Sequence, residues 1–281
     1  MPSITLPDGS IKQFDSTTSP RAVAASIGSG LAKAAIGARV DDVLVDLDHP
    51  IEHDAGIAII TAPRKGQTPS ADALELIRHS CAHVMAEAIQ RVVPDVQLVY
   101  GPALEHGFYY DMAVPDGRPI REDDFTAIEK EMADIIAEDR PFTRYELGLE
   151  DGMSKLQDEG SKYKIDNAQR AAEAGSDTLT WYATGEPGTN WEDLCRGPHA
   201  PSTGRIGAAK IMSVAASYWH GDADSDQLTR VYGTAFFDQA SLDAHLEQLE
   251  EARQRDHRVI GRQLHLFAID EMVGQGLVLW T

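Results

Sequence analysis

A polar, proline-flanked segment, Pro63 to Pro69 (PRKGQTP), divides this chain of 281 residues. Its glycine and its prolines disfavour a helix or strand and favour a linker. The chain is too long for one small core and suits two domains with a connecting piece. We therefore expect a small domain over residues 1–62, a larger domain over residues 63–240, and a linker helix with the start of a further domain over residues 241–281.

The residues before the linker predict a small β-grasp domain. The turn Pro7-Asp8-Gly9 joins two alternating segments as a hairpin, because proline presets φ and glycine tolerates a positive φ. Two Ala-rich helical pieces and further β segments follow, which gives the order ββαβ. The expected strands are Ser3–Leu6, Ile11–Phe14, Val40–Leu47 and Ile57–Thr61, and the helical pieces are Ala22–Ile27 and Leu31–Ala35.

The residues after the linker predict an α+β domain with antiparallel strands. Ser70 is the expected N-cap of a helix whose apolar stripe ends before Pro94. Past Tyr163, strands alternate with Gly-rich turns as far as Phe237. Between Pro94 and Tyr163 we expect strands at Val96–Tyr100, Gly107–Met112 and Thr143–Leu147, and helices at Asp123–Asp139 and Asp151–Gln157.

The last expected helix starts at Ser241 and runs into the one notable basic stretch, Arg253 to Arg262. This stretch offers a surface for phosphates, although a solvated helix with alternating charges explains it equally well. The apolar run from Gly276 to Thr281 reads as a strand with no partner after it. We therefore expect a chain cut short of its next domain.

Charge and composition limit the classes of function. The net charge of -20 argues against a polyanionic partner, because nucleic-acid affinity rests on Lys and Arg. Two cysteines, Cys81 and Cys195, are too few for a disulfide framework. No apolar run approaches the roughly 20 residues of a membrane span. The N-terminus lacks the features of a secretory signal, so we expect a cytoplasmic protein without a membrane partner.

Two motifs carry potential chemistry. His79 and His83 lie four residues apart on the expected helix, which puts both imidazoles on one face. Cys195 and His199 lie in a segment where Gly197 and Pro198 forbid a regular helix, so that loop can project both side chains together. Such a set suits a zinc site or a water-activating site.

Each motif also has a plainer interpretation. An HxxxH pair on an amphipathic helix is often two histidines with no shared role, and a buried cysteine with a turn histidine would explain the second motif. The two together, in a chain with two cysteines, favour function without deciding which.

Five ordered motifs resemble the editing domain of threonyl-tRNA synthetases: HSCAHVMAEAI, YGPALEHGFYYDM, DLCRGPH, YWHGD and RVYGTAFFD. The start with LPDGS resembles the TGS domain that precedes it in that family. EEARQRDHRVIGRQLHLF is similar to the family's link into its catalytic domain. The resemblance covers essentially the whole chain and implies a TGS domain, an editing domain and a truncated class II catalytic domain.

The resemblance implies hydrolysis of the ester of seryl-tRNA(Thr). A threonine pocket cannot strongly exclude serine, because one methylene is worth only about 1–3 kcal/mol. By similarity six residues form the pocket: His79, His83, Lys164, Asp193, Cys195 and His199. His79 and Lys164 would position or deprotonate the water. His83 and His199 would hold the terminal adenosine and the ester, and Asp193 would recognise the serine. Cys195 is not expected to be a nucleophile.

The resemblance also implies partners and cofactors. The partner is the acceptor end of tRNA(Thr) mischarged with serine. ATP, magnesium and zinc belong to the family's catalytic domain, which would also form a homodimer, so aminoacylation is not expected here. Related alanyl editing domains bind zinc through a similar set of residues. The threonyl pocket is described as working without it, and we expect no cofactor or metal.

The chain departs from the family pattern at three places. His220 occupies a usually basic position, and VAASYW replaces a more common glycine-containing run. The stretch from Ala168 to Thr189 is longer than usual and leaves open whether Trp181 or Tyr182 lines the pocket. Two other classes of function stay open from the residues themselves. The histidines and Cys195 would also suit a zinc-dependent hydrolase, and the first domain would also suit a non-catalytic TGS-type binding module.

Overall fold

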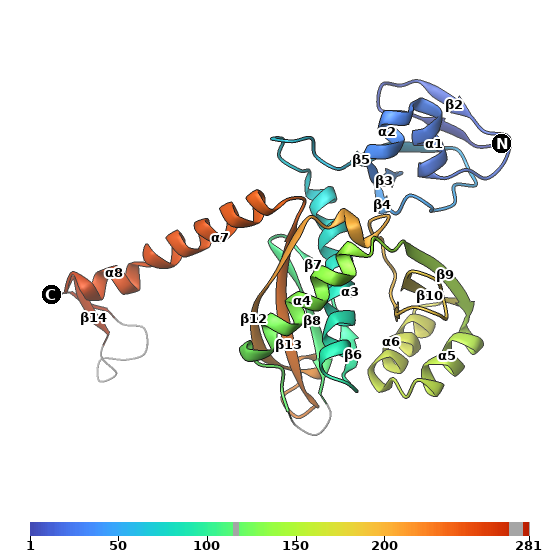
Figure 1. The fold of residues 1–281 in the computed structure, drawn as a ribbon. Coiled ribbons are helices and arrows are strands. Elements are labelled where there is room, and N and C mark those ends of the chain that lie inside the picture. The colour runs from blue at the N-terminus through green and yellow to red at the C-terminus, as the bar shows by residue number, and fades with distance from the viewer. Residues whose placement is uncertain (115–117, 270–277, 281) are drawn as a thin grey trace. The chain divides into compact units, whose positions relative to one another are not determined.

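The structure is a computed structural model that describes residues 1–114, 118–269 and 278–280. The chain forms two compact units, residues 1–237 and residues 238–281 (Figure 1).

The first sixty residues form a five-stranded sheet in the order β2-β1-β5-β3-β4. Strands β1 and β5 are parallel, and the other neighbouring pairs are antiparallel. This confirms the β-grasp prediction. The elements are β1 (Ser3–Thr5), β2 (Ile11–Gln13), α1 (Pro20–Ile27), α2 (Ser29–Ala34), β3 (Ala35–Val40), β4 (Val43–Val45) and β5 (Ala55–Thr61).

One expected strand of this domain was wrong. The segment from Val40 to Leu47 is not a single strand, because the chain reverses at Asp41 and Asp42, both with positive φ. Aspartate tolerates this left-handed region better than most residues, so two consecutive aspartates make a turn here. The helix α1 begins where Ser19 accepts a hydrogen bond from the Ala22 amide, and it buries Val23 against Ile4 and Ile57.

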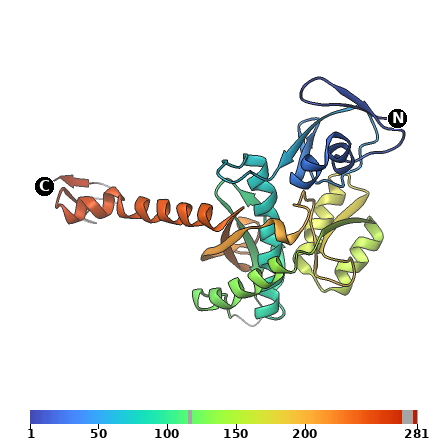
Figure 2. The same ribbon diagram turned by 45° about the horizontal axis from the view of Figure 1, so that its top comes forward.

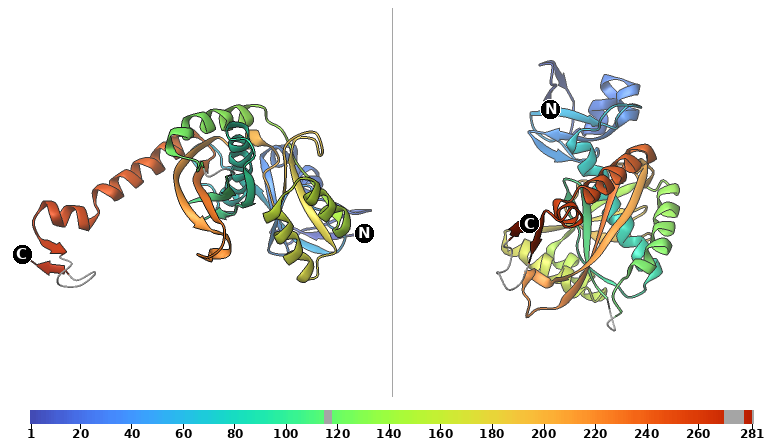
Figure 3. Two further views of the ribbon diagram at one scale, coloured as in Figure 1. Left: turned by 90° about the horizontal axis from the view of Figure 1, so that it is seen from below. Right: turned by 90° about the vertical axis from the view of Figure 1, so that its left-hand side faces the viewer.

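A second sheet, in the order β12-β13-β8-β6, carries helices α3 and α4 on one face (Figure 3). The long helix α3 contributes Met85 and Ile89 to the core, and α4 contributes Ile128 and Met132. These elements are α3 (Ala71–Val92), β6 (Gln97–Tyr100), β7 (Ala103–Leu104), β8 (Gly107–Ala113), α4 (Phe125–Ala137), β12 (Ala208–Tyr218) and β13 (Gln227–Phe236).

A third sheet, in the order β11-β10-β9, packs against helices α5 and α6, which lie side by side (Figure 2). Its small core includes Leu156, Ala168 and Trp181. The elements are β9 (Phe142–Gly148), α5 (Leu149–Asp158), α6 (Lys162–Glu173), β10 (Thr178–Thr184) and β11 (Glu192–Leu194).

Helix α6 corrects the prediction that only strands and turns follow Tyr163. Its buried side chains, Tyr163, Lys164, Ala168 and Ala171, recur at helical spacing. One of them is a lysine and two are small, so the segment looks like surface loop in the sequence.

The second unit contains α7 (Gln239–Gln254), α8 (His257–Gln263), β14 (Phe267–Ile269) and β15 (Val278–Trp280). Helix α7 begins at Gln239 rather than at Ser241, because Asp238 is the N-cap and accepts a hydrogen bond from the Ser241 amide. The strand expected near the end of the chain is present as β15, and its partner is the preceding strand β14. Residues 276, 277 and 281 lie outside the described residues. Among the helices described, none combines the length and the apolar character needed to cross a membrane.

Candidate active site

The HxxxH pair lies on α3, where both histidines face the same side of the helix. Ser70 caps this helix by accepting a hydrogen bond from the Ala73 amide. His79 and His83 are one turn apart, with ring centroids separated by 5.6 Å. The neighbouring Cys81 lies in the hydrophobic core. His83 is only 1% exposed, so its imidazole is presented inside the protein.

The CxxxH loop follows β11 and is anchored to α3. The Cys195 amide donates to the Thr180 carbonyl at 2.9 Å, and the Ala200 amide donates to the Ser80 hydroxyl at 2.8 Å. Gly197 has φ +72 and lies against the Tyr182 hydroxyl, where a Cβ would come within 2.2 Å. Only glycine satisfies both conditions, which is why the loop needs glycine there.

The structure brings the two motifs together. One ligand atom from each of His79, His83, Cys195 and His199 lies within 4.8 Å of the others. The Cys195 sulfur is 3.3 Å from His79 Nε2 and 3.5 Å from His199 Nε2. The His199 ring stacks on His79, with centroids 4.2 Å apart.

The hydrogen-bond partners fix where the imidazole protons lie. His79 Nδ1 must carry a proton, because it is 3.0 Å from the Pro198 carbonyl, which can only accept. The Ser80 hydroxyl donates to the Leu76 carbonyl, so it accepts from His199 Nδ1 at 3.3 Å. Both Nε2 atoms are therefore lone-pair acceptors in the neutral rings. One Cys195 thiol proton cannot satisfy both of them.

Burial keeps all of these groups uncharged. It lowers the pKa of His79, against the effect of the Pro198 carbonyl, and it lowers the pKa of His83 to about 3. Burial and the two neighbouring imidazoles hold the pKa of His199 well below its ordinary value. Burial also raises the pKa of the Cys195 thiol to about 12. The site therefore offers neutral imidazoles and a protonated thiol at neutral pH.

Beside the histidines lies a buried ion pair. Lys164 Nζ on α6 is 2.7 Å from Asp193 Oδ1 on β11. The Tyr110 hydroxyl donates to the other Asp193 oxygen and accepts from Lys164 at 3.0 Å. Burial alone would raise the pKa of Asp193, but the positive charge of Lys164 and these hydrogen bonds outweigh it and lower that pKa. His83 Nε2 lies 3.8 Å from the Asp193 carboxylate and links the two groups.

A cavity of about 780 Å³ opens onto five of the six expected residues: His79, His83, Lys164, Asp193 and Cys195. His199 lies behind it, 1% exposed, and does not belong to the described residues that line the cavity. Neither Trp181 nor Tyr182 lines the cavity among those residues. Trp181 belongs to the small core beneath α5 and α6, and the Tyr182 hydroxyl donates to Asp46. The aromatic residues on the cavity wall are Tyr100 and Tyr110.

Sequence reasoning missed Tyr110, Ser80 and two arginines on the cavity wall, Arg170 and Arg196. Tyr110 and Arg196 stand within motifs that carried the resemblance, which was the available signal. His220 does not line the cavity among the described residues. Its ring stacks on Trp219, and its Nε2 lies 3.2 Å from Asp166 and 2.9 Å from Arg170.

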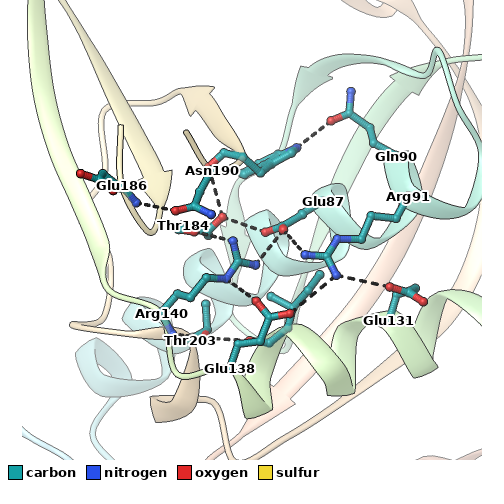
Figure 4. Close-up of polar contacts among 12 residues, drawn as sticks. Glu87, Gln90, Arg91, Glu131, Glu138, Arg140, Thr184, Glu186, Asn190 and Thr203 are labelled. Atoms are coloured by element: carbon teal, nitrogen blue, oxygen red, sulfur yellow. Dashed lines mark hydrogen bonds and ion pairs between the residues drawn. The ribbon is translucent and has the colours of Figure 1, made fainter. Parts of the chain in front are cut away.

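A second polar cluster is centred on Glu87, one turn after His83 on α3 (Figure 4). Glu87, 3% exposed, accepts hydrogen bonds from Arg91, Arg140 and Thr184, each at 2.7 Å. The Trp191 indole donates to Gln90 at 2.7 Å, and its ring packs edge-on against His83. Glu87 thus joins α3 to the end of β10 and to the segment before β9.

The arrangement suits attack of water on an activated bond. The histidines provide neutral acceptors, and the Lys164–Asp193 pair provides fixed charges in a buried cavity. The same donors could also hold a metal ion. Tetrahedral zinc separates its N and S ligands by about 3.3–3.7 Å, and the two Cys195–histidine distances of 3.3 and 3.5 Å fit this range.

Comparison with known proteins gives the chain its family context. A TGS domain model matches residues 2–61, and the model described as "Threonyl and Alanyl tRNA synthetase second additional domain" matches residues 180–232. The threonine–tRNA ligase of Erythrobacter litoralis (strain HTCC2594) is 45% identical over 99% of this chain and 41% of its own length. That of Laribacter hongkongensis (strain HLHK9) is 44% identical over 100% of the chain and 42% of its own length. That of Gluconobacter oxydans (strain 621H) is 46% identical over 100% of the chain and 41% of its own length.

The chain spans about two fifths of the length of these relatives. It carries a TGS domain followed by a larger α+β domain with the threonyl and alanyl synthetase signature, and along its whole length it is similar to the N-terminal part of threonine–tRNA ligases.

Proposed function

We propose that this chain hydrolyses the ester of tRNA(Thr) mischarged with serine. The observation that carries the proposal is the convergence of His79, Cys195 and the Lys164–Asp193 pair on one cavity. At about 780 Å³ this cavity is in the range of sites that hold a drug-sized ligand, so it has room for an amino acid together with a nucleoside. The similarity to threonine–tRNA ligases supports tRNA as the partner.

In the proposed reaction, water attacks the carbonyl carbon of the ester. His79 Nε2 accepts a proton from that water, because its Nδ1 proton is held by the Pro198 carbonyl. The bond between the acyl carbon and the ribose oxygen then breaks, the ribose oxygen takes up the proton that His79 had accepted, and serine and tRNA leave. Lys164 provides the positive charge nearest to the developing oxyanion and helps to orient the water.

The remaining residues bind and position the substrate. Asp193, held ionised by Lys164, accepts hydrogen bonds from the ammonium or hydroxyl group of serine. His83 contacts the ester and the terminal adenosine from the cavity wall. His199 acts indirectly, since it lies behind the wall and fixes Cys195 and the ring of His79. No metal takes part, and Cys195 is not a nucleophile.

The test is deacylation of seryl-tRNA(Thr) against threonyl-tRNA(Thr) by the chain and by His79→Ala. We expect seryl-tRNA to be hydrolysed faster, and the substitution to slow that reaction by about 10²–10⁴-fold, the usual worth of a general base. His106→Ala, at an exposed histidine away from the cavity, is the matched control. Equal rates for the two substrates, or an active His79→Ala variant, would contradict the proposal.

A second candidate is a zinc-dependent hydrolase, favoured by the donor atoms of His79, His83, Cys195 and His199 within 4.8 Å of one another. It predicts about one bound zinc per chain by elemental analysis. It also predicts loss of ester hydrolysis on chelation and no dependence on tRNA. Hydrolysis that survives chelation and requires tRNA would exclude it.

A further inference from the structure

The cavity wall reverses the charge bias of the chain. It contains three cationic side chains, Lys164, Arg170 and Arg196, and two carboxylates, Glu75 and Asp193. The whole chain has 25 Lys and Arg against 45 Asp and Glu. Lys164 pairs with Asp193, and Arg170 pairs with Asp166 on its own helix, so the charges left to meet a ligand are Arg196 and Glu75. The wall therefore lacks the acidic excess of the whole chain and repels an anion less than the rest of the surface does.

The two arginines differ in their availability. Arg170 lies 3.0 Å from the Asp166 carboxylate on its own helix and 2.9 Å from His220. Arg196 is exposed, and among the described residues no carboxylate lies within ion-pair distance of its guanidinium. Its donors are therefore available to a ligand.

The loop holds Arg196 next to the reacting groups. Arg196 directly follows Cys195. The Cys195 amide donates a hydrogen bond to the Thr180 carbonyl, and the Cys195 sulfur accepts one from the Gly197 amide at 3.3 Å. Two residues after Arg196, the carbonyl of Pro198 accepts a hydrogen bond from His79. Because these contacts already hold the backbone at Arg196, binding has to order only the arginine side chain and not the loop.

We propose that Arg196 binds the 5′-phosphate of the nucleotide that carries the ester. This rests on the proposed function, since a ribose ester at the histidines brings the phosphate of the same nucleotide toward the cavity wall. Arginine suits this task because its planar fork can donate two parallel hydrogen bonds to phosphate oxygens. Arg196 thereby distinguishes a nucleotide ester from an ester of an uncharged alcohol.

The experiment measures binding rather than turnover. Two ligands that cannot be hydrolysed are titrated into the full chain: serine joined by an amide to 3′-amino-3′-deoxyadenosine, with and without a 5′-phosphate. We expect the phosphorylated ligand to bind about tenfold more tightly. Arg196→Ala should abolish this advantage, and Arg196→Lys should keep part of it. The salt dependence of log Kd for the phosphorylated ligand should fall by about one unit of slope in Arg196→Ala.

Arg64→Ala, at another exposed arginine that does not line the cavity, should leave both affinities unchanged. Equal affinity of the two ligands for the unchanged chain would overturn the assignment. So would a phosphate advantage that persists in Arg196→Ala, or an equal loss of affinity for both ligands, which would assign Arg196 to loop structure. Failure of the proposed function would give a different result: the chain would not hydrolyse seryl-tRNA but would still bind the phosphorylated ligand more tightly.

Discussion

Lys164 on helix α6 and Asp193 on strand β11 form an ion pair of 2.7 Å, and both side chains are almost completely buried. Removing one member leaves a buried charge without its partner, which typically costs about 3–5 kcal/mol. We predict that Lys164→Met lowers the free energy of unfolding by that amount in urea titrations.

The double variant Lys164→Met, Asp193→Asn is the control for this prediction. It removes the uncompensated charge and should recover part of the loss, so the two single effects should not add. Strict additivity would show that the two residues act independently and would contradict the prediction.

The free energy of unfolding should be equally sensitive to substitution of Glu87, because this buried carboxylate accepts three hydrogen bonds. Glu87→Ala removes the buried one of the two carboxylates that pair with the partly buried Arg140 and leaves only the more exposed Glu138, and we expect a loss of about 3–5 kcal/mol in unfolding free energy. Glu131→Gln, at a more exposed member of the same cluster, should cost less than about 1 kcal/mol. Similar losses for the two variants would mean that burial does not govern this cluster.

Much of the fold follows from local pattern, and the site only partly does. The spacing of His79 and His83 places them on one helix face, and Gly197 with Pro198 marks a loop, so both motifs are visible in the sequence. That the two motifs meet is a tertiary fact, to which contacts between distant residues such as the hydrogen bond from Ala200 to Ser80 contribute.

Lys164 and Asp193 entered only through the resemblance, because no local periodicity signals a pair between a helix and a distant strand. Tyr110 was missed for a related reason. An aromatic residue in an alternating segment suits any strand core, and its hydroxyl gains meaning only beside Asp193. Helix α6 was missed because its buried face carries small residues and a lysine instead of a clear apolar stripe.

The buried histidines should make stability depend on pH. His83 and His199 have lowered pKa values in the folded chain because of burial, about 3 for His83, against about 6.5 when unfolded. Below about pH 6.5 the unfolded chain binds more protons, so stability is complete above that pH and falls as the pH falls. Each histidine contributes about 1.4 kcal/mol per pH unit, or about 2.8 kcal/mol for the two.

Urea titrations at pH 7.5, 6.5 and 5.5 measure this slope. His83→Asn should remove about half of the contribution of this pair, whereas His53→Gln, at an exposed histidine, should leave the slope unchanged. A slope that His83→Asn does not alter would place the titration elsewhere in the chain.

Substitution of Cys195 distinguishes direct hydrolysis by water from a mechanism with a covalent acyl-enzyme. Burial raises its thiol pKa to about 12, so the thiolate that a nucleophile requires is almost absent at neutral pH. We predict that Cys195→Ala keeps seryl-tRNA deacylation within about tenfold, far above the His79→Ala variant, whose loss is about 10²–10⁴-fold. Alkylation by iodoacetamide should also be slow in the folded chain and fast in urea. Loss of activity in Cys195→Ala as large as in His79→Ala, together with trapping of a seryl thioester, would instead assign the sulfur to bond formation.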